Sequence, residues 1–428
     1  MKIRHPAGRN GQKIVFILGG GFAGLNAAKA FEDQKGVFVV LADQRNHHLF
    51  QPLLYQVATA GLSPGDIAVP IRAQFTESSN VEVHWARIEG VNLEKNCVFD
   101  GTDEFYYDYL ILACGARHSY FNHPEWEEFA PGLKTLEQAT EIRRRILSAF
   151  EHAENEMDPV KQKALLNFVV VGGGPTGVEL AGAIADISRT VLVNDFKRID
   201  PSSAKIILIE AGPRVLASFS EDLSKKAQRD LEHLGVEVLT STRVENIDAT
   251  GVTAGALFIP SRSVLWAAGV QAAPLKIQPE VERDRNGRIQ VKEDLSVPGW
   301  KNVFAIGDMA FALDFETGKP VPGLAPAAMQ EGRHVAQVIV EDLRGHPHSP
   351  FRYVDKGQMA TIGKSRAVVQ SGRLKMTGVL AWMAWLFVHI FYLIGFKNRF
   401  SVMLQWAWSY LFSKRGARLI TERDWKLK

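Results

Sequence analysis

The residues best suited to chemistry in this sequence form two glycine clusters, each followed by an acid at the end of a later apolar run. The first cluster, Gly19-Gly20-Gly21-Phe22-Ala23-Gly24, directly follows the apolar residues that begin at Ile14. Gly-x-Gly-x-x-Gly between a strand and a helix is typical of a loop that binds the pyrophosphate of a dinucleotide. Gly19 allows the tight turn, Gly21 lets the backbone approach the phosphates, and Gly24 lets the helix lie close to the strand. The helix N-terminus would offer free N–H groups to the phosphates.

The acid that completes this first pattern is Asp43. It ends the next apolar run, 19 residues beyond Gly24. An acid at this place can accept hydrogen bonds from both ribose hydroxyls of a bound nucleotide. Strand, glycine loop, helix, strand and terminal acid therefore occur in the required order, and together they predict a first dinucleotide site.

The same pattern recurs later in the chain. Gly172, Gly174 and Gly177 occupy the three glycine positions of the second cluster, and the strand-like run KIILI leads into Glu210. Glu210 lies 33 residues beyond Gly177, more than the roughly 20 of the usual pattern, so we expect an extended helix or an insertion at 195–204. The acid favours a free ribose 2′-hydroxyl and hence NAD(H) over NADP(H). Arg214 is close enough in sequence to weaken that preference.

Two dinucleotide sites in one chain imply two dinucleotides. The economical pair is a tightly bound flavin and an exchangeable nicotinamide, since a flavin accepts a hydride and passes the electrons onward. The chain has 428 residues, 46% of them hydrophobic, with a net charge of +3. This composition fits an α/β oxidoreductase of two or three domains and argues against disorder, a collagen-like repeat or a polybasic nucleic-acid binder.

The cysteines and histidines do not predict a metal site. Cys97 and Cys114 are the only cysteines, which excludes a disulfide framework, a four-cysteine cluster and a Cys-x-x-Cys pair. The histidine pairs at 47–48 and 346–348 lack a nearby set of acids or thiols, so we interpret them as loop or packing residues. Hydrolase and NTPase motifs are also absent from the sequence.

The C-terminal part of the chain differs from the body in charge and aromatic content. From residue 397 onward there are eight Lys or Arg against two acids, whereas residues 1–396 carry a net charge of −3. Five of the nine tryptophans lie in the last 47 residues. Basic and aromatic residues together are typical of a protein segment at a membrane surface.

Residues 378–396 contain no Asp, Glu, Lys or Arg and are long enough to span roughly 28 Å as a helix. Basic residues on both sides argue against a span, because they would lie on opposite faces of the membrane. The next segment has an apolar stripe at helical spacing, formed by Phe400, Met403, Leu404, Ala407, Trp408 and Leu411. We therefore predict two interfacial helices over 378–412; a helical pair packed on the core is the alternative.

With these features the sequence resembles the two-dinucleotide-binding-domain flavoproteins, and within them the type II NADH dehydrogenases, which are non-pumping NADH:quinone oxidoreductases of respiratory chains. The resemblance runs from Ile14 to about Ile420. Besides the glycine loops it rests on HHLFQPLLYQVATAGL at 47–62, YDYLILACGARHSYF at 107–121, LWAAGV at 265–270, VFAIGD at 303–308 and the apolar tail at 385–420.

The resemblance implies that the first loop binds FAD and the second NADH. It implies an α/β fold of two Rossmann-like domains, with the NAD domain inserted in the FAD domain, plus a C-terminal amphipathic helical membrane anchor. The chain would leave and re-enter the FAD domain through crossovers containing Gly115 and Gly269. The boundaries we expect are 1–120 and 267–345 for the FAD domain, 121–266 for the NADH domain and 346–428 for the anchoring region.

The resemblance also implies three catalytic positions, and a lysine at the start of the membrane-facing segment is a fourth candidate. Glu179, in the first turn of the second helix, matches a glutamate where nicotinamide meets flavin, with a role in proton supply to the quinone; a structural role at the helix dipole is the alternative. Asp308 matches an acid that reaches the ribityl chain, and a helix N-cap is compatible with this role. Gln330 is the expected hydrogen-bond donor to the flavin edge or quinone, and Lys375 is expected to help orient the quinone or to contact a phosphate.

The sequence departs from the family at one of these places. The quinone-side signature Ala-Gln-x-Ala-x-Gln reads Ala325-Pro326-Ala327-Ala328-Met329-Gln330 here. Pro326 replaces the first glutamine and removes its polar contact, which puts quinone affinity and head-group preference in doubt. Proline is also common in the first turn of a helix and needs no functional reason there.

The predicted function is hydride transfer from NADH to FAD and then reduction of a membrane quinone, ubiquinone or menaquinone, without proton pumping. The alternatives are a membrane flavoprotein with another acceptor, or a docking or regulatory flavoprotein. A sulfide:quinone oxidoreductase would need a redox-active cysteine pair, and a soluble ferredoxin or rubredoxin reductase would not need the apolar tail. The N-terminus lacks the apolar region of a secretion signal, so we expect the cytoplasmic face of a bacterial inner membrane, no nucleic-acid partner, and, from the resemblance, a homodimer through the C-terminal region.

Overall fold

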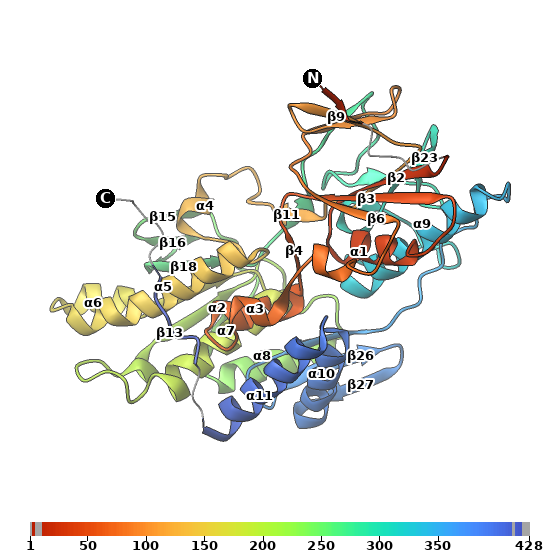
Figure 1. Cartoon of the computed structure of the whole chain (residues 1–428). Helices are drawn as coiled ribbons and strands as arrows, with labels where there is room; N and C mark the ends of the chain where they lie inside the picture. The colour runs from red at the N-terminus through yellow and green to blue at the C-terminus, as the bar shows by residue number, and fades with distance from the viewer. Residues whose placement is uncertain (1, 5–10, 413–415, 422–428) are drawn as a thin grey trace. The chain divides into compact units, whose positions relative to one another are not determined.

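The computed structural model describes residues 2–4, 11–412 and 416–421, and Figure 1 follows its elements along the chain. By their contacts the described residues form two compact units. Unit 1 contains the described parts of 1–48, 69–117 and 270–356, and unit 2 those of 49–68, 118–269 and 357–428. Each unit is thus assembled from three separate stretches of chain, and the predicted α/β class is confirmed in both.

Unit 1 is built on a six-stranded sheet. Its strands are, in order, β22 (Ser296–Val297), β23 (Trp300–Ala305), β10 (Tyr109–Leu112), β2 (Lys13–Leu18), β3 (Val37–Asp43) and β6 (Val81–Trp85), all parallel except β22. The central strands are continuous apolar runs because both faces of a parallel sheet are covered. Helices α1 (Phe22–Ala30) and α9 (Ala325–Asp342) pack against each other, and a Cβ at Gly332 would lie 2.3 Å from the Ala23 carbonyl oxygen.

The rest of unit 1 is a second, five-stranded sheet with short additions. The sheet runs β1 (Lys2–Arg4), β9 (Asp103–Tyr106), β8 (Cys97–Phe99), β7 (Gly90–Asn92) and β20 (Lys276–Gln278). The additions are η2 (Arg72–Gln74), η5 (Gly307–Met309), and the strand pair β21 (Ile289–Gln290) and β24 (Ala310–Phe311). Where the chain passes between the units lie the pairs β4 (His47–Leu49) with β5 (Ala68–Pro70) and β11 (Ala116–His118) with β19 (Val270–Ala272).

Unit 2 is built on a four-stranded parallel sheet in the order β14 (Val236–Leu239), β13 (Lys205–Ile209), β12 (Asn167–Val171) and β18 (Ser263–Trp266). A three-stranded antiparallel sheet, β15 (Asn246–Asp248), β16 (Gly251–Ala254) and β17 (Leu257–Pro260), is added to it. The shorter helical elements are η1 (Gln51–Leu53), α2 (Leu54–Ala58), α3 (Pro64–Ile67), α4 (Trp126–Phe129), α6 (Pro159–Leu165) and η4 (Pro201–Ser203). The longer ones are α5 (Leu136–Asn155), α7 (Pro175–Asp186) and α8 (Glu221–His233).

The long gap between the second glycine loop and Glu210 has a clear structural origin. Helix α7 continues into a π-helical turn, Ile187–Val191, and a loop containing η4 follows before β13 begins. The predicted helix extension is therefore confirmed, and residues 195–204, the expected place of an insertion, form the loop that contains η4.

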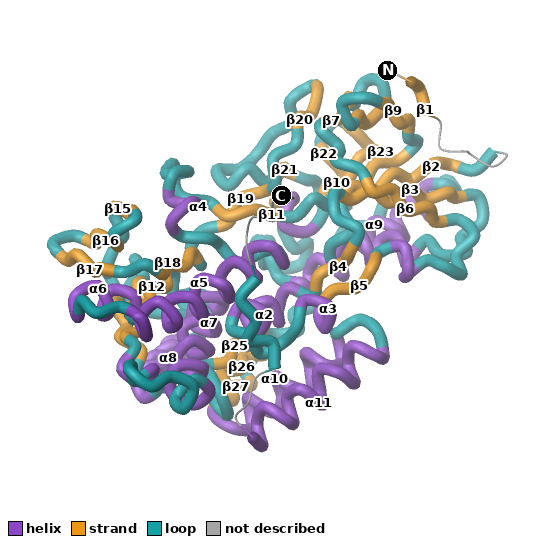
Figure 2. Tube along the Cα trace, turned by 60° about the vertical axis from the view of Figure 1, so that its left-hand side comes forward, coloured by secondary structure: helices purple, strands orange, loops and turns teal. Residues whose placement is uncertain are grey.

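The C-terminal part of unit 2 consists of a hairpin sheet and two helices. The sheet is β25 (Gln358–Thr361), β26 (Ala367–Ser371) and β27 (Leu374–Thr377), and it leads into α10 (Gly378–Tyr392) and α11 (Phe396–Phe412). Figure 2 shows α11 as a long helix beside α10 and this sheet. Among the described residues, no helix is both long enough and apolar enough to cross a membrane.

Helix α11 is two-sided, as the sequence pattern predicts. The predicted stripe is exposed, with Trp408 57% and Leu411 77% accessible. On the opposite side Val402 and Trp406 are buried. The structure covers only part of the basic tail, since the basic residues at 414, 415, 423, 426 and 428 lie outside the described residues.

The two units also show which stretches of chain fold together. Residues 49–68 belong to unit 2, where α2 packs against α5 and α7. Residues from 357 onward belong there too, because α7 packs on β25 and α10 packs on β26. The predicted NADH domain is therefore joined by a short N-terminal segment and by the anchoring helices in one compact unit.

Candidate active site

The first glycine loop connects β2 to α1. Gly19 has φ +106°, a left-handed conformation, and a Cβ there would lie 2.3 Å from the Ala113 carbonyl oxygen. A Cβ at Gly24 would lie 1.9 Å from the Gly19 carbonyl oxygen, so the helix approaches the strand as closely as the motif predicts. A Cβ at Gly21 would meet nothing within 4 Å. The loop is therefore packed at its two ends and open at the position expected to face the phosphates.

Asp43, the last residue of β3, is directed at this loop. One carboxylate oxygen, Oδ2, accepts a hydrogen bond from the Gly20 N–H at 2.6 Å, and Oδ1 accepts one from the Arg45 N–H at 2.7 Å. His48 supports the loop from its buried side, because its Nδ1 donates to the Gly20 carbonyl at 2.9 Å. Burial lowers the pKa of His48 to about 4. The imidazole is therefore neutral and serves packing, as we predicted for this histidine pair.

The second glycine loop, between β12 and α7, repeats this geometry. Gly172 has φ +109°, and a Cβ at Gly177 would lie 1.8 Å from the Gly172 carbonyl oxygen. A Cβ at Gly174 would meet nothing within 4 Å. Glu210 accepts a hydrogen bond from the Gly173 N–H at 2.6 Å with Oε2 and one from the Gly212 N–H at 2.6 Å with Oε1.

Arg214, the residue that weakened the NADH preference, is held by the backbone. Its two Nη atoms donate to the carbonyl oxygens of Phe219 at 2.8 Å and Ala217 at 2.9 Å. The guanidinium thus stabilises the loop before α8. This arrangement supports Glu210, rather than Arg214, as the group that meets the ribose.

Glu179 lies on α7 just past the predicted first turn, which contains no acid because the helix already begins at Pro175, and it is partly buried. Burial raises the pKa of its carboxyl to about 8, although a hydrogen bond with the Thr361 backbone opposes the rise. A carboxyl with this pKa is mostly protonated at neutral pH, so it can store and release a proton. The helix dipole by itself would favour the carboxylate and lower the pKa of Glu179. Because the pKa is raised, the loss of hydration on burial has the larger effect.

Next to Glu179 lies a buried polar network that the sequence did not reveal. The Tyr55 hydroxyl on α2 is 3.2 Å from Thr361 Oγ1 and accepts a hydrogen bond from Gln56 Nε2 at 3.0 Å. Trp406 Nε1 donates to Gln56 Oε1 at 2.7 Å. Burial, followed by the charge of Glu179, raises the pKa of Tyr55. These groups border a cavity of about 100 Å³ that is also lined by residues of α7, α10 and α11.

In unit 1 the predicted Asp308 lies in the short turn η5, just after β23. The turn is tied to α9, because Glu331 accepts a hydrogen bond from the Gly307 N–H at 2.5 Å. Burial raises the pKa of Glu331 to about 8; the Gly307 N–H opposes this rise and the charge of Asp308 adds to it. The sequence analysis missed Glu331, and its place directly after Gln330 is the only signal that could have pointed to it.

Gln330 lies on the first half of α9 and its amide is already engaged. Nε2 donates to the carbonyl oxygens of Pro326 at 3.1 Å and Val354 at 3.0 Å, and Oε1 accepts from the Val354 N–H at 2.9 Å. Helix α9 begins at Ala325, so Pro326 lies in its first turn, where proline leaves no hydrogen bond unmade. Gln330 therefore ties the segment around Val354 to the start of α9.

The two predicted crossover glycines both adopt left-handed conformations. Gly115 has φ +72°, and its carbonyl oxygen accepts a hydrogen bond from the Ala273 N–H at 2.9 Å. Gly269 has φ +65°, and a Cβ there would lie 2.6 Å from the Phe121 ring. Any side chain would be strained at either position.

The remaining predicted positions are engaged in other contacts. Lys375 on β27 pairs with Asp222 at 2.8 Å, and hydrogen bonds from Lys375 and Ser220 lower the pKa of Asp222 to about 2. His348 lies 2.7 Å from Asp294 and 3.4 Å from Asp342. In the part of the chain that is described, no group of three or more His, Cys, Asp or Glu side chains is arranged to hold a metal ion.

Two family models match this chain. The pyridine nucleotide-disulphide oxidoreductase model matches residues 13–332, which contain both glycine loops, and the NDH2 C-terminal domain model matches residues 356–415. The second match covers the hairpin sheet and the helices α10 and α11.

Characterised relatives are similar over almost the whole chain. The type II NADH:quinone oxidoreductase Ndh of Mycobacterium tuberculosis is 42% identical, over 96% of this chain and 90% of that protein. The internal alternative NAD(P)H-ubiquinone oxidoreductase A1 of Arabidopsis thaliana mitochondria is 30% identical, over 95% of this chain and 85% of that protein.

Solved structures share the fold at lower identity. NDH2 from Plasmodium falciparum in complex with NADH has a TM-score of 0.87 at 22% identity, covering 95% of this chain and 99% of that one. The sulfide:quinone oxidoreductase of Aquifex aeolicus has a TM-score of 0.71 at 18% identity, covering 94% and 95%. The fold therefore does not separate these two activities, and the residues of the site have to do so.

Proposed function

The chain belongs to the type II NADH:quinone oxidoreductases, and we propose that its first glycine loop binds FAD and its second binds NADH. It is an FAD-dependent oxidoreductase that transfers two electrons from NADH to a quinone. When bound, FAD supplies the carrier chemistry by accepting a hydride and returning the electrons to an acceptor. The observation that carries the two-site assignment is the repeated loop, open at Gly21 and Gly174 and closed by Asp43 and Glu210.

The residues of the first loop fit the pyrophosphate and ribose of FAD. Open space at Gly21 lets phosphate oxygens approach the N-terminus of α1, where backbone N–H groups and the helix dipole favour an anion. Asp43 would then hold the loop through Gly20 while it accepts from a ribose hydroxyl. We propose that Asp308 and the crossover glycine Gly115 complete the FAD site.

The second loop supports NADH as the donor. Glu210 offers carboxylate oxygens where a ribose 2′-phosphate would otherwise lie, and like charges repel. Arg214, held by two backbone carbonyls, is not free to balance that charge. We propose that Gly269 borders the same nucleotide.

Glu179 is our proposed proton reservoir for quinone reduction. Reduction of a quinone by NADH yields NAD⁺ and a quinol. Besides the hydride from NADH, the reaction consumes one proton, which the protein or the solvent must supply. A carboxyl with a pKa of about 8 holds such a proton at neutral pH. The hydrogen bonds around Tyr55 keep the polar groups beside it satisfied without a fixed charge.

On the quinone side the proposals are Asp308, Gln330 and Lys375. Gln330 would have to release a backbone carbonyl to donate to the flavin edge or to a quinone. Lys375 would orient a quinone only by leaving Asp222. These competing contacts make Gln330 and Lys375 the weaker members of the set, and Pro326 adds no donor.

We further propose that α10 and α11 attach the enzyme to a bilayer surface, so that the quinone, ubiquinone or menaquinone, reaches it from the lipid. The supporting observation is an exposed apolar face with basic residues beside it. Its members are Val379, Leu380, Met383, Phe387, Phe391, Phe396, Phe400, Met403, Leu404, Trp408 and Leu411. Lys397 and Arg399 are exposed in the first turn of α11, beside that face, as expected for an interfacial segment.

Neither α10 nor α11 contains an acid, which supports a reaction without proton pumping.

The site assignment is tested by rapid mixing. The detergent-purified protein is mixed with NADH or NADPH while the flavin absorbance is followed, and a short-chain quinone is then added. We expect fast bleaching by NADH, slower bleaching by NADPH, and recovery on quinone. Bleaching without recovery would point to another acceptor, and no bleaching would favour a docking or regulatory flavoprotein.

The membrane assignment is tested by flotation with liposomes containing anionic lipid. We expect the protein to float, and the double variant Phe387→Ser with Trp408→Ser to remain in the dense fraction. The matched control Phe121→Ser also removes a half-exposed aromatic side chain, but outside the two helices.

We further propose that the protein attaches to the cytoplasmic face of a bacterial inner membrane and that two copies pair through the same helices. Sedimentation in detergent tests the pairing.

A further inference from the structure

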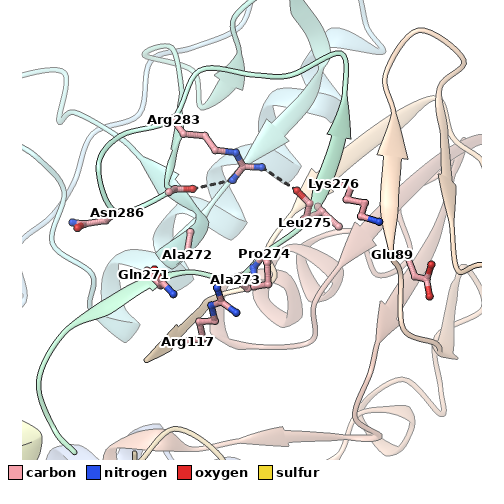
Figure 3. Close-up of a pocket in the computed structure, with 11 residues that line it drawn as sticks. Glu89, Arg117, Gln271, Ala272, Ala273, Pro274, Leu275, Lys276, Arg283 and Asn286 are labelled. Carbon is pink, nitrogen blue, oxygen red and sulfur yellow. Dashed lines mark hydrogen bonds between the residues drawn. The ribbon is translucent and has the colours of Figure 1, made fainter. Parts of the chain in front are cut away.

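A larger cavity, of about 420 Å³, lies in unit 1 away from the residues of both glycine loops. Figure 3 shows the residues that line it, from the paired strands β11 and β19, from β20 and from the hairpin that leads to β21. The volume falls within the range of roughly 300–1,000 Å³ that is usual for small-molecule sites. Nothing in the proposed electron transfer requires this cavity.

The charges around the cavity are unbalanced. Arg117, Lys276 and Arg283 line it together with a single acid, Glu89. None of the three cations forms an ion pair with a carboxylate of the described residues, and Glu280 is the acid that influences Arg283 from a distance. Their neighbour Arg288, in contrast, pairs with Asp284 at 2.7 Å and stacks on Phe311. The lining therefore carries two positive charges in excess.

Two of these cations are already oriented by neutral groups. With its amide oxygen toward the guanidinium, Gln271 accepts from Nε and Nη2 of Arg117 at 2.9 and 3.2 Å. Arg283 donates from Nη1 to the Gly287 carbonyl at 2.9 Å and from Nη2 to the Leu275 carbonyl at 3.2 Å. Such contacts fix a guanidinium without cancelling its charge. Burial lowers the pKa of Arg283, which is the cost of a charge without a close partner.

We propose that this cavity binds a small phosphorylated anion. Oriented guanidinium groups match the oxygens of a phosphate, and an excess of two positive charges suits a group with two or more negative charges better than a single carboxylate. The backbone segment 272–275, with Ala272, Ala273, Pro274 and Leu275, gives the cavity an apolar floor for the rest of such a ligand. The site is separate from both dinucleotide loops and goes beyond the proposed function.

The test uses the FAD-loaded enzyme saturated with NAD⁺, so that both dinucleotide sites are filled, and inorganic pyrophosphate as the probe. Isothermal titration at low salt is expected to show one saturable site per chain, weakened by added salt. The variants Arg117→Ala and Lys276→Ala should each weaken binding about tenfold, as expected for loss of a charged hydrogen-bond partner. The matched control is Arg285→Ala, an exposed arginine of the same hairpin that does not line the cavity. It should change the affinity by less than about twofold.

Each other outcome overturns the proposal. No saturable binding would remove the site, and an equal loss in Arg285→Ala would reduce it to general surface charge. Binding seen only without NAD⁺ would assign pyrophosphate to the second glycine loop. Loss of flavin absorbance in both Arg117→Ala and Lys276→Ala would assign the residues to the FAD site. Pyrophosphate should also raise the unfolding temperature of the wild type but not that of Lys276→Ala, and this readout does not depend on turnover.

Discussion

The two glycine loops have nearly the same local geometry, yet the helices that follow them differ. In both, a Cβ at the third glycine would lie under 2 Å from a backbone oxygen, at 1.9 Å for Gly24 and 1.8 Å for Gly177. In both, an acid accepts from the second glycine's N–H at 2.6 Å. Helix α1 has no acid in its first turns and packs on α9, whereas α7 presents Glu179 and packs on β25. We propose that each loop binds a dinucleotide and that the helix that follows it determines which further groups take part in the chemistry there.

The strongest way to separate the two loops is to introduce the same clash in each. Gly24→Ala and Gly177→Ala place a Cβ against backbone, which cannot move aside as a side chain can. Each should cost about 1–3 kcal/mol of stability. We expect Gly24→Ala to be purified without flavin, and Gly177→Ala to keep its flavin but resist bleaching by NADH. Flavin absorbance and stopped-flow mixing measure the two effects.

A glycine with free space around it provides the control. A Cβ at Gly65, in α3, would meet nothing within 4 Å. Gly65→Ala should keep the flavin and its reduction by NADH, with a stability change under about 1 kcal/mol. If Gly24→Ala retained flavin at full occupancy, the first loop would not be the FAD site.

The next comparison concerns Glu179, which has no counterpart on α1. Glu179→Gln removes the proton but keeps the shape, so kcat should fall about 100-fold with KM for NADH within about twofold. Because the acid form is the active one and its pKa is about 8, wild-type kcat should fall as pH rises through 8. Steady-state rates from pH 6 to 9.5 measure this, and the variant should lack that limb of the profile.

A glutamate at the start of a different helix serves as the control for this variant. Glu221 begins α8, is exposed and pairs with Lys225. Glu221→Gln should keep the wild-type pH profile. If Glu179→Gln had unchanged rates at every pH, Glu179 would have no role in proton supply and only a structural role in the helix.

The acids that accept from the loop N–H groups, Asp43 and Glu210, offer a matched pair of substitutions with a smaller expected effect. Asp43→Asn and Glu210→Gln each replace a carboxylate oxygen that accepts from a loop N–H, and loss of one charged hydrogen bond weakens binding about tenfold. Asp43→Asn should release flavin on dilution, while KM for NADH stays unchanged. Glu210→Gln should raise KM for NADH and narrow the preference over NADPH. If Asp43→Asn affected NADH and Glu210→Gln affected flavin, the assignment would have to be reversed, with NADH at the first loop and FAD at the second.

The smallest effect is expected from Glu331, the buried carboxyl of unit 1. Its pKa of about 8 lies above the ordinary 4.5, so between these values the folded protein binds more protons than the unfolded one. Stability should therefore decrease as pH rises through this window. Glu331→Gln should flatten that part of the curve, measured as the unfolding temperature from pH 5 to 9. An unchanged slope would exclude Glu331 as its source.

The sequence was sufficient for features that depend on neighbours along the chain. The glycine loops, the acids Asp43 and Glu210, the extension of α7 and the exposed stripe of α11 all follow from local spacing. The network of Tyr55 and Thr361 joins residues 306 positions apart, and the Glu331 bond to Gly307 joins residues 24 apart across a turn. No periodicity records such pairs. Both depend on which helix packs on which strand, and this is decided by the whole unit.

The packing of α10 and α11 has a practical consequence for any variant with less exposed apolar surface. On their inner side Trp385 and Trp406 are almost fully buried, and Trp406 holds Gln56, which in turn holds Tyr55. A chain truncated before residue 378 would therefore lose the tryptophans that cover the cavity bordered by Tyr55 and Thr361, as well as the exposed apolar surface. Replacing outward-facing residues such as Phe387 and Leu411 reduces the exposed apolar surface and keeps the buried tryptophans over that cavity.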